Sequence, residues 1–199
     1  GRGKMIRACG PFPRKSARAA QLGENAVLVS SFCKRKRREG MAIDKVRAYL
    51  AEKGFDGRLK EFDVSSATVE LAARAAGVIP ARIAKTLSFA HGQGGMLIVA
   101  AGDAKIDNGK FKSFFLRKAV MLTAEAVEAL TGHAVGGVCP FAVGPEVPVY
   151  LDVSLKRFGT VFPAGGNASS AVELTPDELF CLSNARAWVD VCKLWQEGA

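Results

Sequence analysis

Residues 83–101 most limit how this chain can fold, because they contain two apolar stretches joined by a short glycine-rich turn. In the first stretch Leu87 and Phe89 share one face of an extended strand, since side chains alternate with a period of two. The turn, residues 91–95, has the sequence HGQGG, and residues 96–101 are apolar throughout. The pattern therefore predicts a β-hairpin.

Lys85 interrupts the apolar face of the first strand, residues 83–90. By the period of two, its side chain points the same way as those of Ile83 and Leu87. An ammonium group buried without a partner costs several kcal/mol, so Lys85 either reaches a partner or hydrated cavity, or extends to water from the strand end. The first arrangement makes it a site residue, and the second makes it structural.

A second glycine-rich segment, residues 132–142, has the sequence GHAVGGVCPFA. Gly136 and Gly137 free the backbone, and Pro140 fixes it three residues later. Such a loop can hold its N–H groups towards an oxygen that gains negative charge. The same pattern also fits an ordinary tight turn between two buried segments.

The rest of the chain alternates between helix and strand patterns, without an internal repeat or an interdomain linker after Met41. Apolar periodicity and caps predict helices over 42–53, 65–76, 124–130 and 154–158, after Asp107, and from the capping box of Thr175. Strands are predicted over 58–62, 120–122, 147–151, 160–162, 171–174 and 188–191.

The net charge of +9 comes from the first 40 residues, which hold 11 Lys or Arg and 2 Asp or Glu. Residues 41–199 hold 17 of each sign. We expect residues 1–40 to be a basic, disordered N-terminal extension and residues 41–199 to form the folded domain. A targeting segment or an RNA-binding arm is the alternative for residues 1–40.

Within the domain, residues 105–118 contain a local basic patch, with Asp107 as the single acid. The patch is made of Lys105, Lys110, Lys112, Arg117 and Lys118. A solvated helix face accounts for these charges, and they are also where we expect a phosphate backbone to bind. The phenylalanines between them have helical spacing, which favours a role in the core over base stacking.

Composition disfavours several other classes of protein. The chain is 49% hydrophobic and 24% charged, as in soluble globular proteins, and no apolar run is long enough to span a bilayer. Its five cysteines form no CxxC pair, which fits a reducing compartment, and we expect a cytoplasmic protein. With only His91 and His133 available, we expect no metal site and no cofactor.

Four motifs of this chain resemble, in the same order, those of the YbaK family, the prolyl-tRNA-synthetase-associated editing domains. They are Ala84-Lys85-Thr86-Leu87, residues 132–141, Leu151-Asp152 and Ala164-Gly165-Gly166. The resemblance covers nearly all of residues 41–199; one departure is Ala142, where many members have glycine. It implies a single mixed α/β domain with a largely antiparallel, barrel-like sheet wrapped by helices.

The resemblance also implies hydrolysis, in trans, of the ester that joins a wrong amino acid to tRNA, with Cys-tRNA(Pro) or Ala-tRNA(Pro) as substrate. Mischarged tRNA and prolyl-tRNA synthetase would be the partners. Backbone N–H groups of Gly136, Gly137 and Val138 would stabilise the oxyanion, and Lys85 would position the substrate. No general base stands out, so a tRNA ribose hydroxyl or a group of the substrate would assist. The pocket residues would be His133, Cys139, Pro140, Phe141, Asp152, Gly165 and Gly166.

Three alternatives remain open from the sequence. Cys139 follows His133 by six residues, and the two could form a nucleophile and its base in a small thioester or ester hydrolase. Asp152 could line the pocket or cap the short helix that follows it. The whole domain could also bind tRNA or a synthetase without catalysing a reaction.

Overall fold

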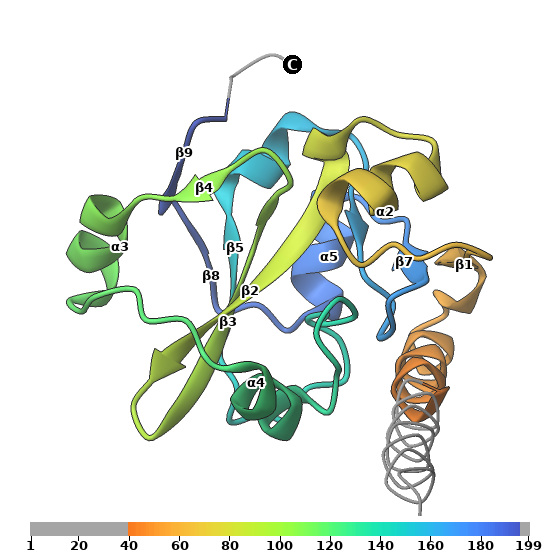
Figure 1. The fold of residues 1–199 in the computed structure, drawn as a ribbon, viewed down its shortest axis with the longest axis horizontal. Coiled ribbons are helices and arrows are strands. Elements are labelled where there is room, and N and C mark those ends of the chain that lie inside the picture. The colour runs from red at the N-terminus through yellow and green to blue at the C-terminus, as the bar shows by residue number, and fades with distance from the viewer. Residues whose placement is uncertain (1–39, 196–199) are drawn as a thin grey trace, which may run out of the picture. The chain divides into compact units, whose positions relative to one another are not determined.

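The hairpin predicted from residues 83–101 lies at the centre of a five-stranded sheet (Figure 1). The computed structural model describes residues 40–195. Its strands are β1 (Leu59–Glu61), β2 (Ile83–His91), β3 (Gly94–Ala101), β4 (Lys105–Ile106), β5 (Val149–Asp152), β6 (Phe162–Pro163), β7 (Ser170–Val172), β8 (Ala187–Val189) and β9 (Cys192–Lys193).

The five-stranded sheet is mixed and has the order β6-β2-β3-β5-β8. Its longest pairing is the antiparallel one between β2 and β3, which runs from Ala84 opposite Ala101 to His91 opposite Gly94. The pairs β2–β6, β3–β5 and β5–β8 are parallel. Two small antiparallel pairs, β1–β7 and β4–β9, complete the strand pairing of the described residues.

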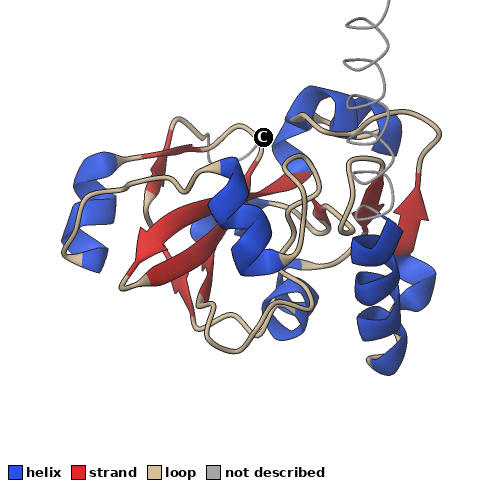
Figure 2. Cartoon of the chain, turned by 60° about the horizontal axis from the view of Figure 1, so that its bottom comes forward, coloured by secondary structure: helices blue, strands red, loops and turns tan. Residues whose placement is uncertain are grey.

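Helices surround these strands, as Figure 2 shows. They are α2 (Val69–Ala76), α3 (Asn108–Phe115), α4 (Ala124–Thr131), α5 (Pro176–Leu182), the short 3-10 helices η1 (Asp56–Arg58), η2 (Pro80–Arg82) and η3 (Val153–Arg157), and a helix whose described part is 40–52. The mixed α/β class implied by the family resemblance is thereby confirmed. Within residues 40–195, no helix has the length and apolar character needed to cross a bilayer.

Side-chain caps begin the helices where the sequence indicates polar N-terminal residues. Asp107 accepts the N–H groups of Gly109 and Lys110 at the start of α3, and the capping box predicted at Thr175 is present in α5. For α2 the cap is Thr68, so the predicted start at 65 is three residues early. The turn before α2 is thereby left free to border the cavity described below.

The core is built on β3, whose residues from Gly95 to Ala101 are all buried. From the basic segment, Phe111 is fully buried against Phe89, with ring centroids 5.1 Å apart. Phe114 is 51% exposed, so the predicted core role holds for only part of the phenylalanine cluster.

Two predictions differ from the structure or fall outside it. Residues 120–122 form no regular strand; they make one bridge to β2, between Met121 and Phe89. The predicted disordered extension, residues 1–40, lies outside the described residues except for residue 40, which is helical.

Candidate active site

A cavity of about 410 Å³ lies against β2. Its other walls come from the start of α2, the segment from Met121 to Val127, the loop from Val135 to Val138, and β7. Most of the lining side chains are small or apolar, and Lys85 is the only titratable side chain among the described residues that line it. The cavity therefore offers one charge in mainly apolar surroundings.

Lys85 is half-buried, and its ammonium group is bound by main-chain oxygens. Nζ donates to the carbonyl oxygen of Gly102 at 2.9 Å and to that of Ala104. Burial lowers the pKa of this ammonium group from its ordinary value of 10.5. Lys85 thus reaches both a partner and a cavity, the first of the two arrangements that its place on the strand allowed.

Asp103 and Arg157 hold the turn that carries these two carbonyl groups. The guanidinium of Arg157, on η3, donates to both carboxylate oxygens of Asp103, at 3.0 and 2.6 Å. Two parallel bonds of this kind fix geometry as well as charge. The position of Lys85 is therefore set by an ion pair outside the cavity.

The glycine loop lines the cavity through Val135, Gly136 and Val138. Gly137 does not line it, because its N–H donates to the carbonyl of Ala134 at 3.0 Å. A Cβ added to Gly137 would lie 2.5 Å from the Cα of Asn167, so this loop packs backbone to backbone on the second glycine loop. In this structure a turn within the loop thus uses the Gly137 N–H, which was predicted to face a ligand.

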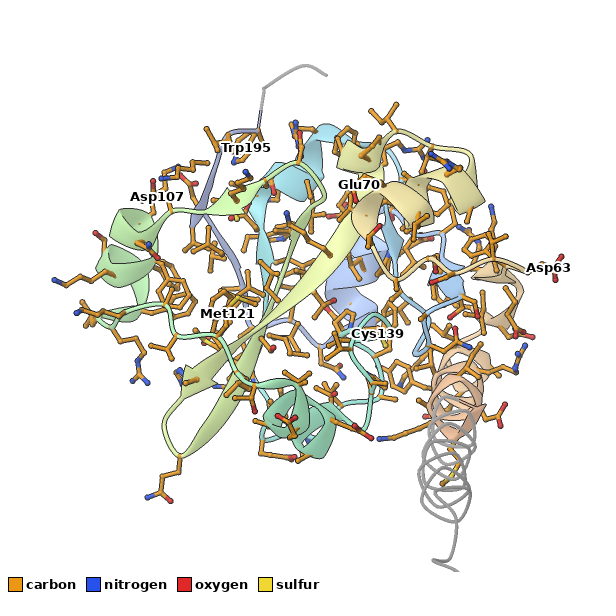
Figure 3. The ribbon with its side chains drawn as sticks, in the orientation of Figure 1. Asp63, Glu70, Asp107, Met121, Cys139 and Trp195 are labelled. Atoms are coloured by element: carbon orange, nitrogen blue, oxygen red, sulfur yellow. The ribbon has the colours of Figure 1, made fainter. Side chains whose placement is uncertain are left out.

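His133 and Cys139 are fully buried and lie side by side. The Cys139 Sγ is 3.6 Å from the His133 Nδ1, which also accepts the Cys139 backbone N–H at 3.5 Å. Burial lowers the pKa of His133 to about 4 and raises the pKa of Cys139 to about 12. At neutral pH the pair is therefore a neutral imidazole and a thiol, neither of which lines the cavity. Cys139 lies within the domain in Figure 3.

The remaining predicted pocket residues also lie away from the cavity lining. Asp152 is buried, and its carboxylate accepts the N–H groups of Ser154 and Val191, so it caps η3. Pro140 and Phe141 are buried, with Phe141 in the main core. Gly165 and Gly166 pack on the side chain of Leu59 and the helix 40–52, respectively. These residues shape the loops around the cavity without bordering it.

A sequence model of the family described as "Aminoacyl-tRNA editing domain" matches residues 64–182. This range includes β2, the glycine loop and β7, and so contains every wall of the cavity. The chain belongs to this family.

Individual relatives of the editing domain agree with this assignment. The chain is 52% identical over 158 residues to YwhH, an uncharacterised protein of Bacillus subtilis (strain 168), covering 78% of this chain and 100% of YwhH. It is 27% identical over 121 residues to EbsC of Enterococcus faecalis, named as a candidate Cys-tRNA(Pro)/Cys-tRNA(Cys) deacylase, covering 60% of this chain and 74% of EbsC.

A solved structure described as that of a candidate trans-editing enzyme for prolyl tRNA synthetase has the same fold. It matches with a TM-score of 0.69 and 31% identity, over 76% of this chain and 97% of that structure. The mixed, curled α/β architecture of the editing domain is thus shared with a structure of nearly the same extent.

A second cavity of the editing domain, about 370 Å³, meets the first at Lys85, Leu87 and Met121. Lys105 lines it. Among the other basic residues predicted to bind tRNA, Lys110 donates to Asp190 at 2.7 Å, and Lys112, Arg117 and Lys118 are exposed. The structure thus places Lys105 at a cavity and the other four predicted tRNA-binding residues at the surface, with Lys110 in an ion pair.

Two walls of the first cavity were not predicted from the sequence. The turn before α2 contributes Ser66, Ala67 and Thr68, and the segment after α3 contributes Met121. The polar cluster 65–68 signalled only a helix start, and Met121 reads locally as a strand residue. Among the described residues, no group of three or more His, Cys, Asp and Glu side chains has the arrangement of a metal site.

Proposed function

We propose that this editing domain hydrolyses the ester bond of a mischarged aminoacyl-tRNA. The observation that carries the proposal is that Lys85 and the glycine loop, through Gly136 and Val138, line one apolar cavity. A cation and main-chain groups around a site of low polarity are suited to stabilise charge that develops on an ester.

In this reaction water adds to the ester carbonyl carbon, and negative charge collects on the carbonyl oxygen. Collapse of this intermediate breaks the bond to the ribose oxygen, which leaves with a proton that came from the water. We assign to Lys85 the placement of the substrate by charge. The described residues that line the cavity include no carboxylate or imidazole, so we assign the first proton transfer to a substrate hydroxyl or a second water molecule.

The name of EbsC supports Cys-tRNA(Pro) as substrate, and the description of the solved relative supports a substrate of prolyl-tRNA synthetase. Ala-tRNA(Pro) is the second substrate that we propose, from the family resemblance. The small side chains around the cavity fit a small acyl group. The description of the solved relative as a candidate trans-editing enzyme supports action in trans. In the same proposal prolyl-tRNA synthetase is the functional partner, and the reaction takes place in the cytoplasm.

Deacylation of a panel of mischarged tRNAs, beginning with Cys-tRNA(Pro) and Ala-tRNA(Pro), tests this function. For Lys85→Ala we expect turnover to fall by about 100-fold or more, the scale on which loss of substrate positioning slows a reaction. The melting temperature should fall by only a few degrees, because the loss of stability is limited to the hydrogen bonds from Lys85 to the carbonyl oxygens of Gly102 and Ala104.

Lys53→Ala is the matched control, because Lys53 is exposed at the end of the helix 40–52. It should retain the activity of the unmodified protein. Unchanged turnover in Lys85→Ala would overturn the proposal. Salt-sensitive tRNA binding without hydrolysis of any member of the panel would instead identify a non-catalytic binding module.

A further inference from the structure

The outer edge of β2 is paired at both ends and open between them. On this edge β6 is in register with Ile83 and Ala84 only. Further along, Ala90 donates its N–H to Val120 at 2.8 Å, and Ser88 accepts the N–H of Leu122 at 3.1 Å. Residues 120–122 are thus the second segment that pairs with this edge. Met121, in the middle of the segment, is labelled beside β2 in Figure 3.

The main-chain N–H and C=O of Thr86 face this open stretch. Residues two apart in a strand direct these groups to the same edge, and Ser88 and Ala90 direct theirs to the edge that meets residues 120–122. The opposite edge is occupied by β3. Within residues 40–195, no strand or loop is in register with Thr86 on the outer edge.

The open stretch borders the first cavity. Side chains of consecutive strand residues point to opposite faces, yet Lys85, Thr86 and Leu87 all line this cavity. Contact with all three is what a cavity against the strand edge is expected to show. Its lining also includes Ala124, where the chain turns into α4 instead of continuing beside β2.

An α-aminoacyl group has the polar groups needed to fill this position. In an antiparallel sheet, a hydrogen-bonded pair of residues exchanges two bonds, one from each N–H to the opposite C=O. An aminoacyl ester carries an ammonium group and a carbonyl oxygen around one α-carbon, as one strand residue does. It can therefore continue the pairing of residues 120–122 where the chain itself departs.

We infer that the main chain of Thr86 binds the aminoacyl group of the substrate, an inference that rests on the proposed function. Its N–H donates to the ester carbonyl oxygen and to the oxyanion formed when water adds to the carbonyl carbon. Its C=O accepts a hydrogen bond from the α-ammonium group. Thr86 then supplies the donor that Gly137 does not, since the Gly137 N–H is bonded to Ala134.

The test replaces one atom. Position 86 is occupied by valine in one variant and by the α-hydroxy analogue of valine, which gives a main-chain ester, in the other. The two variants have the same side chain and differ in one main-chain group, the N–H of residue 86, which the ester variant replaces by an oxygen atom. Valine itself should be tolerated, because the Thr86 hydroxyl oxygen has no hydrogen-bond partner among the described residues. Thr86→Pro, which also removes the N–H at an unpaired strand position, is a second variant.

Two readouts separate this inference from the proposed function. The first is deacylation of Ala-tRNA(Pro), for which the ester variant should lose about 100-fold in kcat relative to Thr86→Val. The second is affinity for a non-hydrolysable analogue, alanine joined by an amide to 3′-amino-3′-deoxyadenosine, which should weaken about tenfold.

Equal analogue affinity in the ester and valine variants would overturn the inference, whatever the turnover. Lack of deacylation by the unmodified protein, with analogue binding still sensitive to the ester, would overturn the proposed function alone. The unmodified protein should also prefer alanyl-tRNA to propionyl-tRNA, which lacks the α-ammonium group, by about tenfold. Equal rates on these two substrates would refute the role of the Thr86 C=O.

Discussion

The buried imidazole and thiol of His133 and Cys139 hold the glycine loop in place. The Nδ1 of His133 accepts the N–H of Cys139, and the N–H of His133 donates to the hydroxyl of Thr131. Because both side chains are shielded from water, neither is charged at neutral pH. Their effect is therefore expected in stability, not in proton transfer.

For His133 this predicts a stability that depends on pH. Its folded pKa of about 4 lies below the ordinary 6.5, so between these values only the unfolded chain binds the proton. The unfolding free energy should therefore fall by roughly 3 kcal/mol as pH decreases through this window. Urea unfolding at several pH values measures it, and His133→Asn should remove most of this slope. An unchanged slope in His133→Asn would show that other groups cause it.

Cys139→Ala should leave deacylation within about twofold of the unmodified protein and lower the unfolding free energy by about 1 kcal/mol, the scale expected for a small cavity in the core. The physical reason is that the buried thiol, with its pKa raised to about 12, is not available as a nucleophile. Turnover of mischarged tRNA and chemical unfolding measure the two effects. Loss of turnover with an intact fold would restore the covalent mechanism.

Among the elements, the two glycine loops support each other by direct backbone contact. Gly137 has the Cα, C and N atoms of Asn167 within 2.8 Å of the position of a Cβ. Backbone atoms cannot move aside as a flexible side chain can, so this contact fixes the distance between the loops. The wall formed by Gly136 and Val138 depends on that distance.

We therefore expect Gly137→Ala to lower the unfolding free energy by about 2 kcal/mol, the usual scale of overpacking, and to reduce deacylation by displacing the loop. Gly57→Ala is the control, because no atom lies within 4 Å of its Cβ position. Thermal unfolding and turnover of the two variants check the expectation. If they were equally stable, the close contact would not constrain the loop.

This contact also explains how far the sequence could predict the site. Local patterns were sufficient for the hairpin of β2 and β3 and the caps at Asp107 and Thr175, and they reduced Lys85 to two alternatives, a site residue or a residue that extends to water. They could not reveal that Gly137 packs directly on the backbone of Asn167, thirty positions away. Nor could they reveal the open edge at Thr86, which exists only because β6 and residues 120–122 stop short of it.

At the scale of the whole molecule, the domain has little net charge, and its exposed basic patch lies near the cavity lined by Lys105. Because Lys110 is paired with Asp190, the cations of the patch that are best placed for phosphate are Lys112, Arg117 and Lys118. Contacts of this kind contribute to affinity through the release of counterions.

Replacing these three residues by alanine should weaken tRNA binding and reduce the slope of log Kd against log salt by about 2 to 3, close to one for each lost phosphate contact. Filter binding at several salt concentrations measures the slope. The control replaces Lys53 and Lys156, which lie outside the patch, and should leave it unchanged. Equal slopes in both variants would place the tRNA elsewhere on the surface.

The ammonium group of Lys85 is anchored by main-chain carbonyl oxygens, whereas most charged side chains are anchored by side chains of opposite charge. Every amino acid supplies the same carbonyl, so exchange of the side chain at Ala104 cannot delete the acceptor. What preserves the anchor is the path of the turn, which Gly102 secures because a Cβ there would lie 2.0 Å from the Pro80 carbonyl oxygen. A scan of side chains would therefore find this anchor not at the acceptors themselves but at the residues that hold the turn, Gly102 and the Asp103–Arg157 pair.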